Sequence, residues 1–210
     1  MEPFRILRAI ACPLPAANVD TDQLIPARFM KRSRSDGYGG FLLHDLRFDG
    51  DGSPHPEFPL NRPERSGSRI LVARRNFGGG SSREAAVYAL VDHGFRCVVA
   101  PSFGDIFSAN AVNNALLPAL LDDDAVERLL AWLEAGGTEV EVDLEERSLA
   151  AGGMRWQFGI DPVWRMKLLN GWSDVDLTLS HRAAIGEFAQ TDQERRPWAW
   201  LKDEHPPGDA

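Results

Sequence analysis

In the middle of the chain, hydrophobic positions follow two patterns: short continuous runs and helical spacing. Residues 70–73 and 97–100 are short, continuous apolar runs, which are typical of buried strands. Between them, residues 83–93 carry apolar side chains at helical spacing, and Gly94 follows as a helix stop. A strand, a turn, a helix and a second strand in this order predict an α/β unit with parallel strand pairing.

The same reading predicts further elements beyond residue 100. In chain order these are a short helix at 103–110, a strand at 116–120, an amphipathic helix at 125–135, strands at 138–144 and 154–158, and helices near 162–169 and 177–190. We expect the last two strands to pair with each other through the glycine turn at 152–153. The predicted fold is therefore α/β, with a mostly parallel central sheet flanked by helices. One domain is expected over residues 1–190, followed by a polar tail at 191–210.

The first third of the chain is less regular. A short apolar run at 6–11 is followed by segments rich in turn-forming residues. Residues 31–40 combine basic side chains with glycine and lack periodicity, which favours a mobile loop. Residues 49–68 contain four prolines, which is typical of a long surface connection.

Composition narrows the class of protein. The 210 residues carry a formal net charge of -8, which argues against nucleic-acid binding, because that function needs a basic face. An anionic small molecule stays possible, since a few local arginines can outweigh the net charge. The amino-terminal residues do not resemble a secretion signal, and no apolar run approaches the roughly 20 residues that span a bilayer. We expect a cytoplasmic protein that does not bind membranes, with Cys12 and Cys97 reduced.

Candidate chemistry centres on the turn between the first predicted strand and helix. Gly78, Gly79 and Gly80 are followed by Ser81, Ser82 and Arg83, and then by Glu84. Glycines allow backbone N–H groups to point into a concavity, and a helix start adds unsatisfied donors and partial positive charge. Together with an arginine, these groups predict a site for an anion, such as a carboxylate.

Common glycine-rich motifs do not fit this turn. A phosphate-binding P-loop requires a lysine after its glycines, a nucleophile elbow requires a glycine at position 83, and a dinucleotide fingerprint requires a third spaced glycine. A plain alternative is a serine-capped helix in which Glu84 completes a capping box. The residues by themselves leave the anion site and the capped helix both open.

Three collinear motifs resemble one family. Residues 76–84 resemble the signature of the aconitase superfamily's swivelling domain, and most closely that of isopropylmalate dehydratase small subunits. Residues 18–26 resemble the family's NxDTDxIxP element, and residues 100–118 its APSFxDIF…NxLLP element. The order, the spacing and the overall length agree, and the likeness extends from about residue 5 to about residue 190.

The resemblance implies a reaction and a set of roles. Family members move a hydroxyl group between adjacent carbons by dehydration and rehydration, as in the conversion of 2- to 3-isopropylmalate in leucine biosynthesis. By this pattern Ser81 is the catalytic base next to a substrate carboxylate. The residues that would bind the small hydroxy-dicarboxylate substrate are Gly80, Ser82, Arg83, Asp20, Thr21 and Asp22. Segment 31–40 lies where relatives have a substrate-recognition loop, although a solvated basic linker would have the same composition.

The resemblance also implies a cofactor and a partner. Relatives use a [4Fe-4S] cluster, which requires several cysteine thiolates, and two cysteines are too few to hold one. We therefore expect no cofactor or metal on this chain, and a cluster-bearing large subunit as its obligatory partner.

Two positions depart from the family pattern. Gly79 stands where relatives usually have cysteine, and Ala85 stands where they usually have histidine. These differences keep two alternatives open. One is a related hydro-lyase subunit for another small hydroxy-diacid, such as a citramalate-like or methylmalate-like compound. The other is a non-catalytic, anion-binding regulatory subunit.

Overall fold

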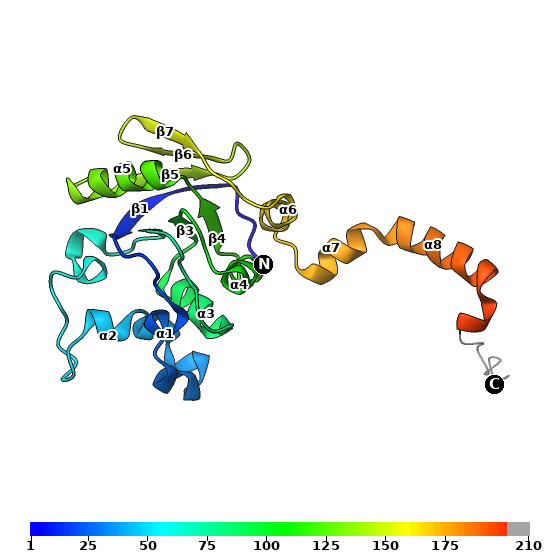
Figure 1. Cartoon of the computed structure of the whole chain (residues 1–210), viewed down its shortest axis with the longest axis horizontal. Coiled ribbons are helices and arrows are strands. Elements are labelled where there is room, and N and C mark those ends of the chain that lie inside the picture. Colours follow the sequence, from blue (N-terminus) through cyan, green and yellow to red (C-terminus); the bar gives the residue numbers. More distant parts are fainter. Residues whose placement is uncertain (201–210) are drawn as a thin grey trace. The chain divides into compact units, whose positions relative to one another are not determined.

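Seven strands form one sheet in the computed structural model, which describes residues 1–200. The strand order is β4-β3-β2-β1-β5-β6-β7 (Figure 1). The strands span β1 (Ile6–Leu14), β2 (Ile70–Ala73), β3 (Cys97–Ala100), β4 (Leu117–Leu120), β5 (Glu139–Asp143), β6 (Ser148–Ala151) and β7 (Met154–Gln157). The predicted α/β class is confirmed.

Strand β1 joins two halves of this sheet that differ in strand direction. Its second part pairs in parallel with β2, with Ala11 opposite Ile70, and β2, β3 and β4 continue the parallel pairing. Its first part pairs antiparallel with β5, with Ile10 opposite Glu139, and β6 and β7 extend that half. The central parallel sheet therefore ends in an antiparallel extension at one edge.

Helices cover the parallel half on both faces. Strand β2 alternates, since Ile70 and Val72 belong to one apolar cluster and Leu71 and Ala73 to the other. The first cluster includes the apolar stripe of α5 (Asp123–Glu134), and the second includes that of α3 (Glu84–His93). The two helices lie on opposite sides of the strands (Figure 1). The continuous apolar character of β2 and β3 follows from this burial on two faces.

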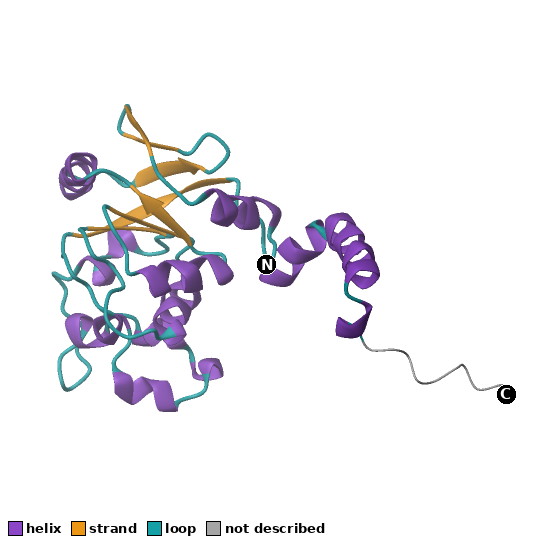
Figure 2. Cartoon of the chain, turned by 45° about the vertical axis from the view of Figure 1, so that its right-hand side comes forward, coloured by secondary structure: helices purple, strands orange, loops and turns teal. Residues whose placement is uncertain are grey.

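The remaining helices of the first 172 residues are short. The α-helices are α1 (Thr21–Leu24), α2 (His44–Arg47), α4 (Asp105–Asn113) and α6 (Pro162–Asn170), and the 3-10 turns are η1 (Ala27–Lys31), η2 (Arg34–Asp36), η3 (Tyr38–Phe41), η4 (Pro59–Asn61) and η5 (Pro63–Arg65). The helices predicted at 83–93, 103–110, 125–135 and 162–169 are thus confirmed within a few residues. The β6–β7 hairpin projects from one end of the sheet (Figure 2).

The strand pairing predicted for 138–144 and 154–158 was wrong. Strand β6 lies between them, and the glycine turn at 152–153 joins β6 to β7. Residues 148–151 form a strand because both neighbours supply hydrogen-bond partners, although the segment contains only one large apolar side chain, Leu149.

The mobile loop predicted at 31–40 was also wrong. This segment folds into 3-10 turns against α3: Arg34 forms an ion pair with Asp92, and Tyr38 is buried. A Cβ atom on Gly39 would lie 2.5 Å from the backbone of Asp92, so the two segments are in direct contact. Segment 49–68 is exposed near its start, but Arg65 is buried and donates to the carbonyl oxygens of Ala11, Leu133 and Gly137.

Residues from Ser173 onward form a second unit by their contacts. It contains α7 (Asp174–Ser180), α8 (Arg182–Arg195) and η6 (Pro197–Ala199), so the single helix predicted at 177–190 is divided in two. The family domain at 1–190 and the tail at 191–210 stay predictions, and residues 201–210 of that tail lie outside the described part. Within residues 1–200, no helix has the length and apolar character needed to cross a membrane.

Candidate functional site

Three loops meet at the carboxyl edge of the parallel strands. Residues 15–20 follow β1, residues 74–83 follow β2, and residues 101–104 follow β3. Because β1, β2 and β3 are neighbours with the same direction, their outgoing loops emerge side by side. Ligands of α/β proteins bind preferentially at this edge.

The β1 loop is hydrogen-bonded to the glycine turn along its length. The Gly78 amide donates to the carbonyl of Val19 at 2.7 Å, and the Thr21 amide donates to the carbonyl of Gly79 at 3.0 Å. The Thr21 hydroxyl is buried and donates to the Ser81 carbonyl at 3.1 Å. Thr21 therefore fixes the backbone of the turn, and its hydroxyl is not available to a ligand.

The β3 loop holds the opposite side of the same turn. The Phe77 amide donates to the Ser102 carbonyl at 3.0 Å, and the Gly104 amide donates to the Phe77 carbonyl at 2.9 Å. The Ser102 hydroxyl accepts from the Asn76 amide at 2.8 Å. The sequence reasoning did not assign this supporting role to Ser102, although the residue lies within the family-like motif at residues 100–118.

Two of the three glycines are required by the backbone. Gly78 has a φ of +72°, and a Cβ atom there would lie 2.2 Å from the Phe107 ring. Gly80 has a φ of +93°, a conformation that side chains with a Cβ rarely adopt. Gly79 is different, because its added Cβ would meet only the side chain of Asn76, at 3.2 Å. The backbone at position 79 would therefore accommodate either the glycine of this chain or the cysteine that relatives usually have.

The turn presents a row of unused hydrogen-bonding groups at the surface. Ser81 and Ser82 are exposed, and neither hydroxyl has a partner among residues 1–200. The backbone N–H groups of Gly80, Ser81 and Ser82 also lack partners within that range, whereas the Arg83 amide donates back to Ser81. Helix α3 adds the amides of Glu84 and Ala85, which likewise have no partner among residues 1–200, whereas the Ala86 amide donates to the Arg83 carbonyl at 3.2 Å. This concentration of donors suits a carboxylate or a developing oxyanion.

The alternative of a serine-capped helix is wrong. Arg83 occupies the N-cap position of α3, and no side chain caps the helix. The Glu84 carboxylate instead accepts from the side chain of Asn114, at 2.9 Å. The serines are thus not consumed in capping, which leaves them free for a ligand.

Arg83 is held over the turn by an ion pair with Asp22. The contact uses only one terminal nitrogen of the guanidinium, Nη1, so Nη2 and Nε remain for a ligand. Asp20 has a different task, since its carboxylate caps α1 by accepting from the Gln23 amide at 2.8 Å. All the predicted site residues therefore lie at or against the turn. Their roles in binding and catalysis stay predictions.

Two other predicted features lie farther along α3. Ala85 is half-buried and packs against the apolar cluster of this face, where a histidine would meet the same surroundings. Segment 31–40 is fixed through Arg34 to Asp92, at the end of α3 opposite to the glycine turn. Lys31 and Arg32 are exposed. A direct substrate contact by this segment stays a prediction.

Neither cysteine is suited to hold an iron–sulfur cluster. Cys12 and Cys97 are buried in strands β1 and β3. Burial raises the pKa of the Cys12 thiol to about 12 and also raises that of Cys97, so both side chains stay protonated near neutral pH. Cluster ligands must be thiolates. No group of three or more potential metal ligands occurs in the part of the chain that the structure describes.

Comparisons with known proteins identify the family of the chain. The family described as the aconitase C-terminal domain matches residues 1–124. The chain is 48% identical over 189 residues to the 3-isopropylmalate dehydratase small subunit of Geobacillus kaustophilus, covering 90% of this chain and 96% of that protein. It is 43% identical over 188 residues to the small subunit of the same name from Shouchella clausii, covering 90% and 95%.

A solved structure supports the fold separately. The crystal structure of 3-isopropylmalate dehydratase from Methanocaldococcus jannaschii matches with a TM-score of 0.62 at 24% sequence identity. The match covers 87% of this chain and 98% of that one.

Proposed function

The chain belongs to the 3-isopropylmalate dehydratase small-subunit family of aconitase-type hydro-lyases, and we propose that it supplies one half of an active site that converts 2- to 3-isopropylmalate. This reaction is a step of leucine biosynthesis. The observation that carries the proposal is the turn Gly80–Arg83. The amides of residues 80–82 and the hydroxyls of Ser81 and Ser82 have no partner among residues 1–200, and the Arg83 guanidinium pairs with Asp22 alone.

Substrate binding is assigned to the donors of this turn. An isopropylmalate molecule carries two carboxylates, and the amides of Gly80 and Ser82 are placed to accept one of them. The free edge of the Arg83 guanidinium would add a charge-assisted hydrogen bond. Asp22 restricts the rotation of that guanidinium, so it acts as a positioning residue.

Proton transfer is assigned to Ser81. The reaction removes a proton from the carbon next to a carboxylate and a hydroxide from the neighbouring carbon, and then adds water back in the opposite sense. An ordinary serine hydroxyl is too weak an acid to serve as an alkoxide near neutral pH. The surrounding N–H groups and Arg83 stabilise negative charge on its Oγ and on the substrate, which favours the proton transfer.

The other half of the active site is assigned to a large subunit. The residues of this chain do not fit a [4Fe-4S] cluster, because both thiols are buried and protonated. We assign the cluster to the partner subunit, where it would act as the Lewis acid for the departing hydroxyl. An open turn on one chain and a cluster on another would also explain why the two hydroxyls lie at the surface. A cytoplasmic location is part of this proposal.

The two alternative functions are not favoured. Identities of 43% to 48% over about nine tenths of the chain all point to small subunits that share one name. A purely regulatory subunit would not need to keep two serines and an arginine with free hydrogen-bonding capacity. The substitutions at Gly79 and Ala85 lie beside and behind these groups, and they leave the donors in place.

The proposal is tested by co-expression with the matching large subunit and anaerobic reconstitution. Turnover is then measured on 2-isopropylmalate, 3-isopropylmalate, citramalate and 3-methylmalate. We expect the two isopropylmalates to give the highest kcat/KM. Turnover of another diacid without turnover of isopropylmalate would contradict the substrate assignment, and no turnover of any diacid by a cluster-loaded complex would contradict the hydro-lyase function.

A further inference from the structure

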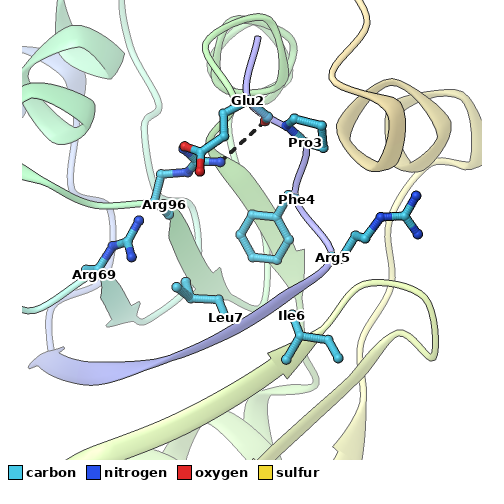
Figure 3. Close-up of a pocket in the computed structure, with 8 residues that line it drawn as sticks. All are labelled: Glu2, Pro3, Phe4, Arg5, Ile6, Leu7, Arg69 and Arg96. Atoms are coloured by element: carbon cyan, nitrogen blue, oxygen red, sulfur yellow. Dashed lines mark hydrogen bonds and ion pairs between the residues drawn. The ribbon is translucent and has the colours of Figure 1, made fainter.

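A small basic pocket lies at the amino edge of the parallel strands, opposite to the glycine turn. Arg69 directly precedes β2 and Arg96 directly precedes β3, and the Arg96 amide donates to the Arg69 carbonyl at 2.8 Å. The segment that leads into β1 supplies the remaining wall, with Phe4 beside the two arginines and Leu7 below them (Figure 3). Because the pocket and the turn lie at opposite ends of the same strands, the two sites are distinct.

The size of the pocket restricts its ligand. The cavity has a volume of about 110 Å³ and is partly open to solvent. Sites for cofactors and drug-sized molecules occupy about 300–1,000 Å³, so a nucleotide does not fit. The space suits a single phosphate group or a single carboxylate group.

The charges of the lining favour an anion. Three of the eight lining residues are arginines and one is an acid, Glu2, although the whole chain has a net charge of -8. Arg5 points away from the other two and pairs with Glu145 (Figure 3). The Arg69 guanidinium is exposed and has no partner among residues 1–200. Such a local reversal of sign concentrates anions at one place on an acidic protein.

Arg96 provides two further observations. Its Nε is buried and has no hydrogen-bond partner, which is costly for a charged group. Its Nη1 pairs with the Glu2 carboxylate, and its Nη2 donates to the backbone carbonyl of Glu2 at 3.4 Å (Figure 3). The Glu2 side chain is 72% exposed, so one member of the pair is largely solvated. Ion pairs of this kind contribute little and are readily exchanged.

We propose that Arg69 and Arg96 form a binding site for a small oxyanion, in which the Glu2 carboxylate is an intramolecular competitor. An incoming phosphate or carboxylate displaces the Glu2 carboxylate from Arg96 and binds to the guanidinium groups of both Arg69 and Arg96. Planar guanidinium forks match both ligand types, so the shared chemistry is that of an oxyanion of one phosphate or carboxylate group.

The test is a calorimetric titration of the full-length chain at constant ionic strength. Inorganic phosphate, acetate and malonate are titrated separately, which distinguishes a phosphate ligand from a carboxylate ligand. We expect saturable one-to-one binding of at least one of them, in the range of ~1 mM. The Glu2→Gln variant should bind about two- to fivefold more tightly, because the competitor is removed. The Arg69→Gln variant should bind about tenfold more weakly.

A matched control separates this site from a general effect of charge. Arg8→Gln also removes one positive charge, but Arg8 lies on β1 and does not line the cavity. We expect its affinity to stay within about twofold of the unaltered chain. Since Arg69 is exposed, its substitution should preserve the fold, which thermal unfolding verifies. Absence of saturable binding by all three anions, equal affinities for all variants, or an equal loss in Arg8→Gln would each overturn the proposal.

Discussion

The two halves of the sheet differ in how their strands are connected and in what they carry. Strands β1 to β4 run parallel, so helices must connect them, and the loops after β1, β2 and β3 meet at one edge. Strands β5 to β7 run antiparallel and are joined by short turns. The candidate site residues and all three family-like motifs belong to the parallel half. The long connections of the parallel half bring residues that are distant in sequence together at one site. The short turns of the antiparallel half only join neighbouring strands, whose buried side chains complete the core.

Removal of the Ser81 hydroxyl should give the largest difference in kcat between substitutions in the two halves of the sheet. In the reconstituted enzyme, Ser81→Ala is expected to lower kcat by about 10²- to 10⁴-fold, because the proposed proton acceptor is lost. Association with the large subunit should be unchanged, as measured by analytical ultracentrifugation. Thr138→Ala removes an exposed hydroxyl next to β5 and should leave kcat unaltered. Normal turnover by Ser81→Ala would exclude the proposed role.

A core substitution in the antiparallel half should have the opposite profile. Leu149 on β6 is fully buried. Leu149→Ala should reduce the free energy of unfolding by about 2–5 kcal/mol, measured by chemical denaturation, because it leaves a cavity. The kcat per folded molecule should stay normal. A large loss of kcat in the folded protein would show that this half also shapes the site.

Two glycines with similar backbone angles make a matched pair across the halves. Gly78 has a φ of +72° and faces the Phe107 ring, whereas Gly153, between β6 and β7, has a φ of +79° and open space around it. Gly78→Ala should cost about 2–4 kcal/mol of unfolding free energy, since overpacking adds to backbone strain. Gly153→Ala should cost about 1–2 kcal/mol from strain alone. Equal losses would contradict the close packing at Gly78.

The smallest expected effect concerns the ion pair between Asp22 and Arg83. Asp22→Asn should raise KM for isopropylmalate about two- to fivefold, because the guanidinium loses its restraint. The unfolding free energy should change little. Glu141→Gln breaks a comparable surface pair with Arg8 in the antiparallel half, and it should leave KM unchanged. An unaltered KM in Asp22→Asn would remove Asp22 as a positioning residue.

The same comparison explains which elements were predictable from sequence. Strands β2 and β3 are buried on both faces, so they are continuous apolar runs that stand out from the helices around them. Strand β6 consists of Ser148, Leu149, Ala150 and Ala151, and its conformation depends on hydrogen bonds to β5 and β7. A strand that depends on such pairing has no distinctive hydrophobic pattern in its own sequence, so it is not predicted from that sequence. Segment 31–40 was mispredicted for the same reason, since its order depends on contacts with α3.

Prediction of the candidate site had a similar limit. The glycine turn and its serines were located from local chemistry and from the family-like motif. The geometry that holds them came only from the structure. The Thr21 hydroxyl reaches the Ser81 carbonyl across 60 residues, and Arg83 reaches Asp22 across 61. The sequence placed these residues near one another only through the resemblance, and it did not predict which side chains would be consumed by structural contacts.

The most direct test of the proposed half-site is backbone hydrogen exchange in the assembled enzyme, with and without isopropylmalate. The amides of Gly80, Ser81 and Ser82 have no partner among residues 1–200, so they should exchange rapidly in the free chain. We predict that substrate slows their exchange by about tenfold or more, while the β6–β7 hairpin is unaffected. Unchanged exchange at residues 80–82 in a substrate-saturated complex would contradict the central claim that this turn binds the substrate.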